Sequence, residues 1–210
     1  MNLAKFTVGA LLLILHLWGG VRAQGLAQLD EGSVYSAAIR EIQKRLEQDG
    51  HQSKRFVVLK ESLVGADSER LRGRNSVDRN FNLQNRRSVP INENFYAGSA
   101  TIVFVHLSEV EALIERSRRE WEELEAKRFA ETGLRVPSTC GAPWTYFNQR
   151  FEGAEGYYRL SRVEFSNDRR TANVEIMGAG GCWNSSDWFQ FRWTSGRWKI
   201  HIAGGGYGVS

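Results

Sequence analysis

The sequence predicts an α+β protein, an antiparallel β-meander or curved sheet with N-terminal and central helices packed on one face. Three observations predict this class. Apolar and polar residues alternate through much of 157–202, as in half-buried antiparallel strands. Two earlier segments, 30–49 and 108–131, repeat apolar residues at helical spacing. Two short β-branched runs, 56–59 and 100–107, lie between those segments and predict buried strands.

The clearest element is a hairpin at 187–202, closed by Ser195 and Gly196. A two-residue loop ending in glycine favours a type I′ turn, in which both central residues have positive φ. Counting outward predicts six cross-strand pairs: Thr194–Arg197, Trp193–Trp198, Arg192–Lys199, Phe191–Ile200, Gln190–His201 and Phe189–Ile202. One face is then apolar and the other polar, and a slip of one residue would mix them. The pattern therefore specifies the register.

The remaining elements follow in order along the chain. The first helix, 30–49, ends at Gly50, where a C-terminal glycine cap belongs. The central helix begins with Ser108 as N-cap and ends before Gly133, with a core-facing side that includes Leu124. A helix is also considered at 76–87, and one or two helical turns at 144–151. The apolar phase of 157–165 changes near Ser161, which indicates a β-bulge.

The N-terminus has the features of a signal peptide at 1–23, which leaves 24–210 as a single α+β domain. Lys5 supplies the positive end, 6–18 the apolar stretch, and 21–23 a small-residue cleavage site. The apolar stretch is shorter than the about 20 residues of a membrane span, and an uncleaved anchor is the alternative. Cleavage removes Lys5 and Arg22, so the formal charge falls by two from +4. We expect no nucleic-acid partner and no stable membrane span after cleavage.

Two cysteines, Cys140 and Cys182, remain in the domain. In an oxidising compartment a disulfide between them is the simple expectation, and it would close a loop of about 42 residues. Two free buried thiols are the alternative.

The last third of the chain resembles a group of uncharacterised bacterial secreted proteins with the tail W..F....G..GY..LSRVGF....ALV....CG..CG......K..G.W. The matching residues are Trp144, Phe147, Gly153, Gly156, Tyr157, Leu160, Ser161, Arg162, Val163, Phe165, Ala172, Val174, Cys182, Gly196, Arg197 and Trp198. The resemblance implies secretion and a related fold, but no activity. The chain departs from the group at Glu164, where the group has glycine, and keeps only the later of two close cysteines. That loss favours pairing of Cys182 with Cys140, and equally permits a free Cys182.

The sequence offers few groupings with catalytic or metal-binding spacing. His51, His106 and His201 lie in no metal-spaced cluster. Ser185, Ser186, Asp187 and His201 are the residue types of a hydrolytic triad, but no nucleophile-elbow pattern surrounds the serines. The glycine-rich runs 178–181 and 204–206 do not lead into helices, so we expect turns or a flexible end there rather than phosphate loops. We assign no catalytic, cofactor-binding or metal residue, and no cofactor.

The pattern favours a secreted or periplasmic, non-enzymatic binding or envelope-associated domain, whose partner is another protein or a small molecule. Trp183 and Trp188, beside a glycine-rich run, belong either to an apolar groove or to the core. The alternative is a secreted hydrolase using His201 with Asp187 or Glu175. Glu175 is also the candidate acid to offset the repulsion between the opposed Arg192 and Lys199.

The predicted signal peptide gives a direct test. We expect export to leave Gln24 as the first residue, and N-terminal sequencing of the exported protein checks this. Replacing the small residue before the cleavage site, Ala23→Phe, should leave the chain uncleaved because the peptidase needs a small side chain there. Exported protein that still begins with residue 1 would instead support the uncleaved anchor.

Overall fold

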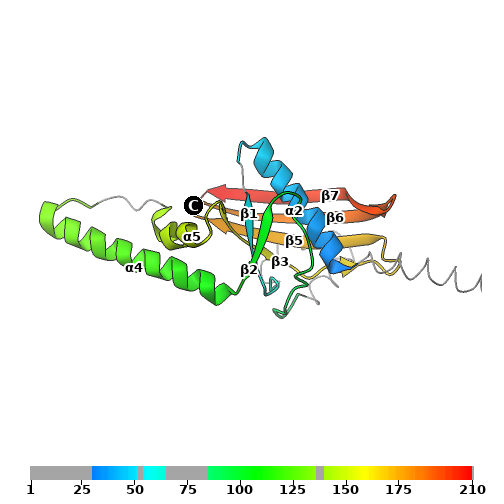
Figure 1. The fold of residues 1–210 in the computed structure, drawn as a ribbon, viewed down its shortest axis with the longest axis horizontal. Coiled ribbons are helices and arrows are strands. Elements are labelled where there is room, and N and C mark those ends of the chain that lie inside the picture. The colour runs from blue at the N-terminus through cyan, green and yellow to red at the C-terminus, as the bar shows by residue number, and fades with distance from the viewer. Residues whose placement is uncertain (1–29, 52–53, 65–84, 136–139, 210) are drawn as a thin grey trace, which may run out of the picture.

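The computed structural model describes residues 30–51, 54–64, 85–135 and 140–209. The α+β class is confirmed (Figure 1). The helices are α2 (Glu31–Gln48), α4 (Leu107–Thr132) and α5 (Thr145–Arg150), with a 3-10 turn, η2 (Ala142–Trp144), before α5. The strands are β1 (Arg55–Leu59), β2 (Thr101–Val105), β3 (Gly156–Leu160), β4 (Glu164–Phe165), β5 (Thr171–Gly180), β6 (Trp183–Thr194) and β7 (Arg197–Val209). The helix considered at 76–87 falls mostly outside the described residues.

All seven strands form one mixed sheet in the order β2-β1-β3-β5-β6-β7, with β4 pairing to β5. The predicted meander is its antiparallel part, β3 to β7. The two early β-branched runs join it differently, because β1 is parallel to both β2 and β3. The cause is connectivity: β1 is joined to β2, and β2 to β3, by long connections, which parallel neighbours need.

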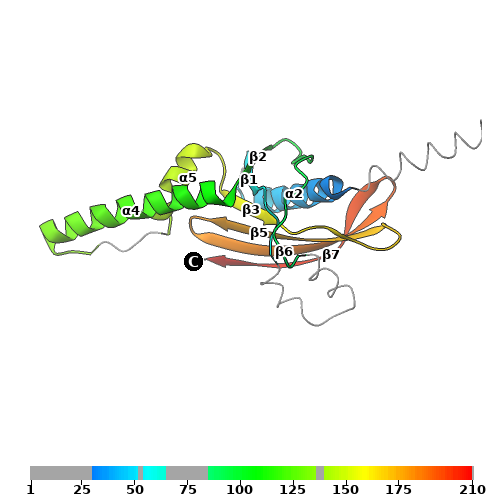
Figure 2. The ribbon, with the colours of Figure 1, turned by 90° about the horizontal axis from the view of Figure 1, so that it is seen from below.

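The helices divide between the two faces of the sheet. Phe56 and Val58 of β1 pack in the core cluster that contains α2, whereas Val57 and Leu59 pack in the cluster that contains α4 and α5. Since successive side chains of a strand point to opposite faces, α2 covers one face and the α4–α5 pair the other. Only α2 packs on the expected face of the sheet, and the central helix α4 lies on the other face with α5. Figure 2 shows α2 running along the sheet.

Helix α2 forms where the sequence places its caps and its apolar stripe. The Asp30 side chain accepts a hydrogen bond from the Ser33 amide at 2.8 Å, which satisfies one free donor of the first turn. Gly50, with φ +85°, follows the last turn. Tyr35 lies fully buried in the stripe and donates to the carbonyl of Ser161 at 2.9 Å. The first turn is tied to the sheet as well, because the Trp198 indole donates to the Ser33 hydroxyl at 3.0 Å.

The N-cap of helix α4 lies two residues before the predicted one. It is His106 and not Ser108, and the His106 side chain makes no cap hydrogen bond. A carboxylate from the end of β1 takes that place: Glu61 accepts from the Leu107 amide at 3.3 Å and pairs with His106 Nδ1 at 2.5 Å. Burial acts to raise the pKa of Glu61, but the hydrogen bonds from His106 and the Leu107 amide together hold it below its ordinary value.

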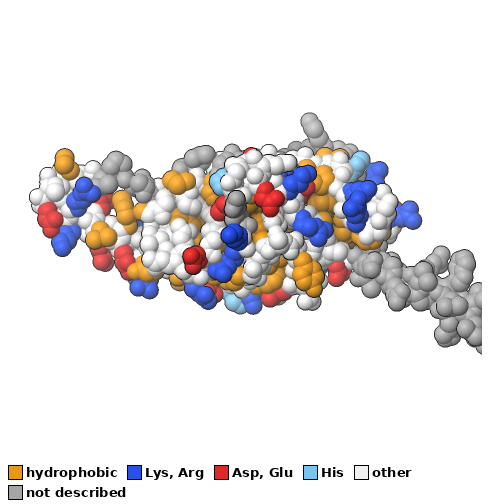
Figure 3. Space-filling model, turned by 45° about the horizontal axis from the view of Figure 1, so that its top comes forward, with side chains coloured by type: hydrophobic (Ala, Val, Ile, Leu, Met, Phe, Trp, Pro, Cys, Tyr) orange, Lys and Arg blue, Asp and Glu red, His pale blue; other side chains and the backbone are white. Residues whose placement is uncertain are grey.

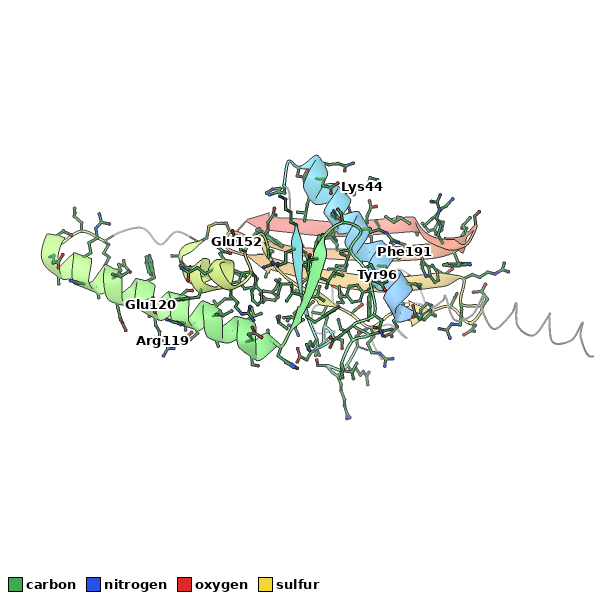
Figure 4. All side chains as sticks on the ribbon, in the orientation of Figure 1. Lys44, Tyr96, Arg119, Glu120, Glu152 and Phe191 are labelled. Carbon is green, nitrogen blue, oxygen red and sulfur yellow. A yellow bond between two sulfur atoms is a disulfide. The ribbon has the colours of Figure 1, made fainter. Side chains whose placement is uncertain are left out.

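The distal half of α4 extends beyond the sheet (Figure 1). Leu124, predicted to face the core, is 67% exposed. Arg119 and Glu120 project from the middle of the helix (Figure 4). The helix is held to the body near Ser117, whose hydroxyl accepts from the Tyr146 amide of α5 at 2.9 Å. The apolar spacing of the sequence therefore predicts the helix correctly but not where its tertiary contacts end.

The C-terminal hairpin confirms the predicted turn and four of the six predicted pairs. Ser195 and Gly196 have φ values of 53° and 77°, and the pairs run from Thr194–Arg197 to Phe191–Ile200. The last two pairs are wrong, since a β-bulge leaves His201 unpaired and sets Gln190 opposite Ile202 and Phe189 opposite Ala203. The bulge moves Ile202 off the α2 face, and its side chain is 45% exposed.

Most of the two glycine-rich runs is strand and not a flexible end, and only Gly181 lies in a turn, between β5 and β6. Gly178 and Gly180 lie in β5, and 204–206 lies in β7. Each opposes a larger side chain of β6: an added Cβ would stand 2.2 Å from the Trp183 indole at Gly180 and 2.4 Å from the Trp188 indole at Gly204. Such separations are far below van der Waals contact, so the absent Cβ atoms make room for the two indoles. The glycines therefore serve packing between neighbouring strands.

The predicted interruption of the first meander strand is present, since β3 ends at Leu160 and β4 begins at Glu164. Ser161 makes two hydrogen bonds to β5, both 2.8 Å long. Its amide donates to the Glu175 carbonyl, and its hydroxyl accepts from the Glu175 amide.

The predicted disulfide is also present. Cys140 and Cys182 are bonded with their Cα atoms 4.9 Å apart, which ties the chain before η2 to the β5–β6 turn.

The disulfide should contribute strongly to stability. It closes a 42-residue separation, for which the chain-entropy account gives about 4 kcal/mol. We expect Cys140→Ala/Cys182→Ala to lower the free energy of unfolding by roughly that amount, measured by denaturant unfolding. Addition of reductant to the wild type should match the double variant. A loss below about 1 kcal/mol would mean that the β5–β6 turn is held by other contacts.

Candidate functional site

A cavity of about 540 Å³ lies between the C-terminal end of α2 and the strands β3, β6 and β7. One wall is the last turns of the helix, and the other is the sheet face that α2 covers. The lining residues are Ile42, Arg45, Leu46, Asp49, His51, Glu155, Tyr158, Trp183, Ser185, Asp187, Gly205 and Gly206. The cavity thus combines an aromatic and aliphatic surface with five ionisable side chains from three parts of the chain.

The aromatic surface is held by the strand glycines. The indole of Trp183 lies over Gly178 and Gly180, so neither position has room for a Cβ. Its Nε1 donates to the carbonyl of Glu155 at 3.3 Å, and its ring lies 5.9 Å from that of Tyr158. Both rings are therefore fixed in place before any ligand arrives.

An ion pair crosses the cavity from helix to sheet. The Arg45 guanidinium donates to Asp187 Oδ1 at 2.8 Å and stacks over the Phe189 ring at 5.0 Å. Gly205, the cross-strand partner of Asp187, leaves room for this carboxylate, because a Cβ there would stand 2.5 Å from Oδ1. The Asp187 side chain of the pair is largely buried, whereas the Arg45 side chain is 37% exposed at the cavity surface.

Burial raises the pKa of the Asp187 carboxyl above its ordinary value of 3.8, although Arg45 and a hydrogen bond from Ser185 act in the opposite direction. The raised pKa shows that the loss of hydration of the Asp187 carboxylate outweighs its stabilisation by Arg45 and Ser185. A carboxyl kept in such a place is held at a cost to folding.

A second pair lies at the cavity mouth. His51, just past the end of α2, has its Nδ1 3.3 Å from Glu155 Oε2, immediately before β3. Because both side chains line the cavity, the pair joins the helix end to the sheet at the opening. With Asp49, the cavity carries three carboxyl groups and one arginine.

The structure separates the residues proposed for a hydrolase. Asp187 lies in the cavity with Arg45. His201 lies on the opposite face, where its Nε2 contacts Arg192 at 3.3 Å. Glu175 is buried, pairs across strands with Trp188 and accepts from the Ser186 hydroxyl at 3.1 Å. His201 and Asp187 are thus not brought together, and Glu175 does not lie beside Arg192 as expected.

Sequence reasoning identified Asp187 and Trp183 but missed Arg45, His51, Glu155 and Tyr158. One signal for Arg45 was present: it follows Ile42 by three residues, so the helical period puts it on the sheet-facing side. No local pattern marks His51 and Glu155, which meet through folding across a separation of more than a hundred residues.

Comparisons with known proteins identify no relative. No family model, curated protein or solved structure matches the chain significantly. The resemblance of the last third to bacterial secreted proteins therefore stays a prediction. Within the described ranges, no group of three His, Cys, Asp or Glu side chains is arranged to hold a metal ion. None of the helices described is long and apolar enough to cross a membrane.

The charge balance in the cavity can be measured directly. Because Arg45 lowers the pKa of Asp187 against the effect of burial, Arg45→Met should raise that pKa further, as read from an NMR titration of the carboxyl carbon. Arg40→Met, on the exposed side of α2, is the matched control and should leave it unchanged.

The sign for stability follows from proton binding. An acid with a raised folded pKa binds its proton more tightly in the folded state, so its contribution is most favourable at low pH. The wild type should lose stability relative to Asp187→Asn as the pH rises from about the ordinary value of 3.8 through the folded pKa. An Asp187 pKa at or below 3.8 would contradict the dominant role of burial.

Proposed function

We propose that this protein is an exported, non-enzymatic binding domain whose ligand site is the cavity between α2 and the sheet. The observation that carries the proposal is the Arg45–Asp187 pair, a charged donor and acceptor fixed inside a cavity with an aromatic wall. A charged pair in such a place is often no more stabilising than an apolar pair of similar size. Contact with a ligand would explain why the cavity holds the Arg45–Asp187 pair.

The size and lining of the cavity support a small organic ligand. Its volume of about 540 Å³ lies within the range of about 300–1,000 Å³ typical of small-molecule sites. Such sites combine a mostly apolar lining with a few well-placed polar groups. Here Trp183, Tyr158, Ile42 and Leu46 supply the apolar surface, and Arg45, Asp187 and Ser185 supply the polar groups.

The charges favour a ligand with an apolar body and a basic or hydrogen-bond-donating group. Arg45 is already engaged by Asp187, whereas the lining holds three carboxyl groups in total. Trp183 and Tyr158 present ring faces suited to a flat or cationic group. A strongly anionic ligand would meet more carboxylates than cations.

Export is the second part of the proposal. The N-terminal signal pattern and the resemblance of the last third to bacterial secreted proteins support it. The disulfide between Cys140 and Cys182 agrees with an oxidising destination, whether periplasm or medium.

The test is a ligand screen read by thermal unfolding, because any compound that binds the folded state raises its melting temperature. We expect aromatic and aliphatic amines to raise it and the matching carboxylic acids to do so less. Ser185→Phe fills the cavity and should abolish the shift. Asp187→Asn should weaken binding of the amines by about tenfold or more, since hydrogen bonds to charged groups are worth about 1.5–3 kcal/mol.

Two matched variants serve as controls. Arg40→Met removes a guanidinium from the exposed side of the same helix, and Glu152→Gln changes a carboxyl group close to Glu155 in sequence but outside the lining. Both should bind as the wild type does. A ligand whose shift survives in Ser185→Phe would place the site elsewhere, and turnover of a bound compound would contradict the non-enzymatic part of the proposal.

A further inference from the structure

Positive charge is concentrated at the end of the sheet where the β6–β7 turn lies. Arg192, Arg197 and Lys199 lie on the hairpin, and Arg169 and Arg170 lie on the neighbouring turn before β5. We call these five exposed residues the hairpin-tip patch. Figure 3 shows basic side chains gathered over this end of the molecule. The small net charge of the whole chain conceals this concentration.

The basic groups of the hairpin are not neutralised by nearby acids of the described chain. Arg192 and Lys199 stand directly opposite each other, and His201 contacts Arg192. Arg170, Arg192, Arg197 and Lys199 form no ion pair with any described residue. Like charges facing each other destabilise a sheet, so the arrangement favours contact with an external negative surface.

The acids at this end are engaged by other groups. Asp168 accepts hydrogen bonds from the Ser166 hydroxyl and the Arg170 amide. Glu31 pairs with Arg162 at 3.6 Å, and Asp30 caps α2. Asp168 offsets part of the charge of Arg170, which leaves Arg192, Arg197 and Lys199 as the strongest part of the patch.

Apolar side chains border the charge. Ile202 is 45% exposed, and the bulge at His201 turns it to the face of Arg192, whereas Ile200, 38% exposed, stays on the opposite face of the edge strand, paired with Phe191. Both lie on β7, the edge strand. A surface that joins basic groups to exposed aliphatic side chains is typical of proteins that sit on the headgroup region of a bilayer.

The N-terminal segment enters the fold at the same end. The first turn of α2 contacts the hairpin, since the Trp198 indole donates to Ser33. The apolar stretch at 6–18 is separated from Asp30 by eleven residues, which can span at most about 40 Å. The hairpin-tip patch therefore lies at the end of the sheet beside the first turn of α2.

We propose that the hairpin-tip patch docks on the headgroups of an anionic lipid bilayer. The contact is peripheral and needs no membrane span. A nucleic acid fits this surface less well, because the rings of Trp193 and Trp198 pack edge to face at 5.2 Å and Trp198 is buried. The face of Trp198 is therefore not available for a base to stack on.

The test uses the chain purified after export, with its N-terminus verified, and co-sedimentation with vesicles. Vesicles of neutral phosphatidylcholine are compared with vesicles containing about one third phosphatidylglycerol. We expect tighter binding to the anionic vesicles, lost in high salt because screening removes the attraction. Arg197→Gln/Lys199→Gln should weaken this binding about 30-fold, since each basic residue near such a surface contributes about fivefold.

The control removes the same charge elsewhere. Lys127→Gln/Arg128→Gln lies on the exposed distal part of α4, far from the hairpin tip (Figure 1), and should bind anionic vesicles as the wild type does. All the substituted side chains are exposed, and thermal unfolding verifies that each variant is folded. Inorganic phosphate in millimolar excess should not displace the vesicles.

Three results would overturn the proposal. Equal binding to neutral and anionic vesicles would remove the role of charge. An equal loss in the two double variants would show a net-charge effect without a local site. Binding of a single-stranded oligonucleotide without binding to any vesicle would show that the patch binds nucleic acid instead of lipid.

Discussion

The packing of α2 on the face of β5 and β6 is the interaction on which the rest of the structure depends. Along the helix, the inward side chains change from Ile39 and Ile42 to Arg45, with burial falling toward the C-terminus. Along β6, the inward side chains change from Phe191 and Phe189 to Asp187. The two transitions occur at the same level, so a dry core gives way to a polar cavity. Figure 4 shows Phe191 beside α2.

The glycines of β5 and β7 make this arrangement possible. Trp183 lies across Gly178 and Gly180, and Asp187 faces Gly205. A Cβ at any of these positions would displace a cavity wall, so the shape of the cavity requires glycine there. The opposite end of the same sheet, at the β6–β7 turn, is closed by paired tryptophans and presents basic groups to the surroundings. One sheet thus carries an open polar cavity near one end and an exposed basic surface at the other.

The sequence pattern predicted correctly those parts of the fold that residues close together in the chain determine. The alternation around Ser195-Gly196 specifies the turn and the pairs nearest to it, and Gly50 and Gly133 mark the C-terminal ends of the two long helices. The prediction failed where distant contacts decide. The bulge at His201 ended the counted register, and Glu61, just beyond the end of β1, capped α4 in place of Ser108. Of the site, Trp183 was visible beside a glycine-rich run and Asp187 as a triad-type acid beside two serines, whereas the His51–Glu155 pair exists through the tertiary fold alone.

The most direct test of the account is a double-mutant cycle on the free energy of unfolding with Arg45→Met and Asp187→Asn. If the register of α2 on the sheet brings these groups together, the cycle should give a favourable coupling of about 1 kcal/mol. The same cycle with Arg45→Met and Glu152→Gln, which no described contact joins, should give none. A coupling between Arg45 and Asp187 equal to that of the control would contradict the register from which both the cavity and its proposed ligand site are derived.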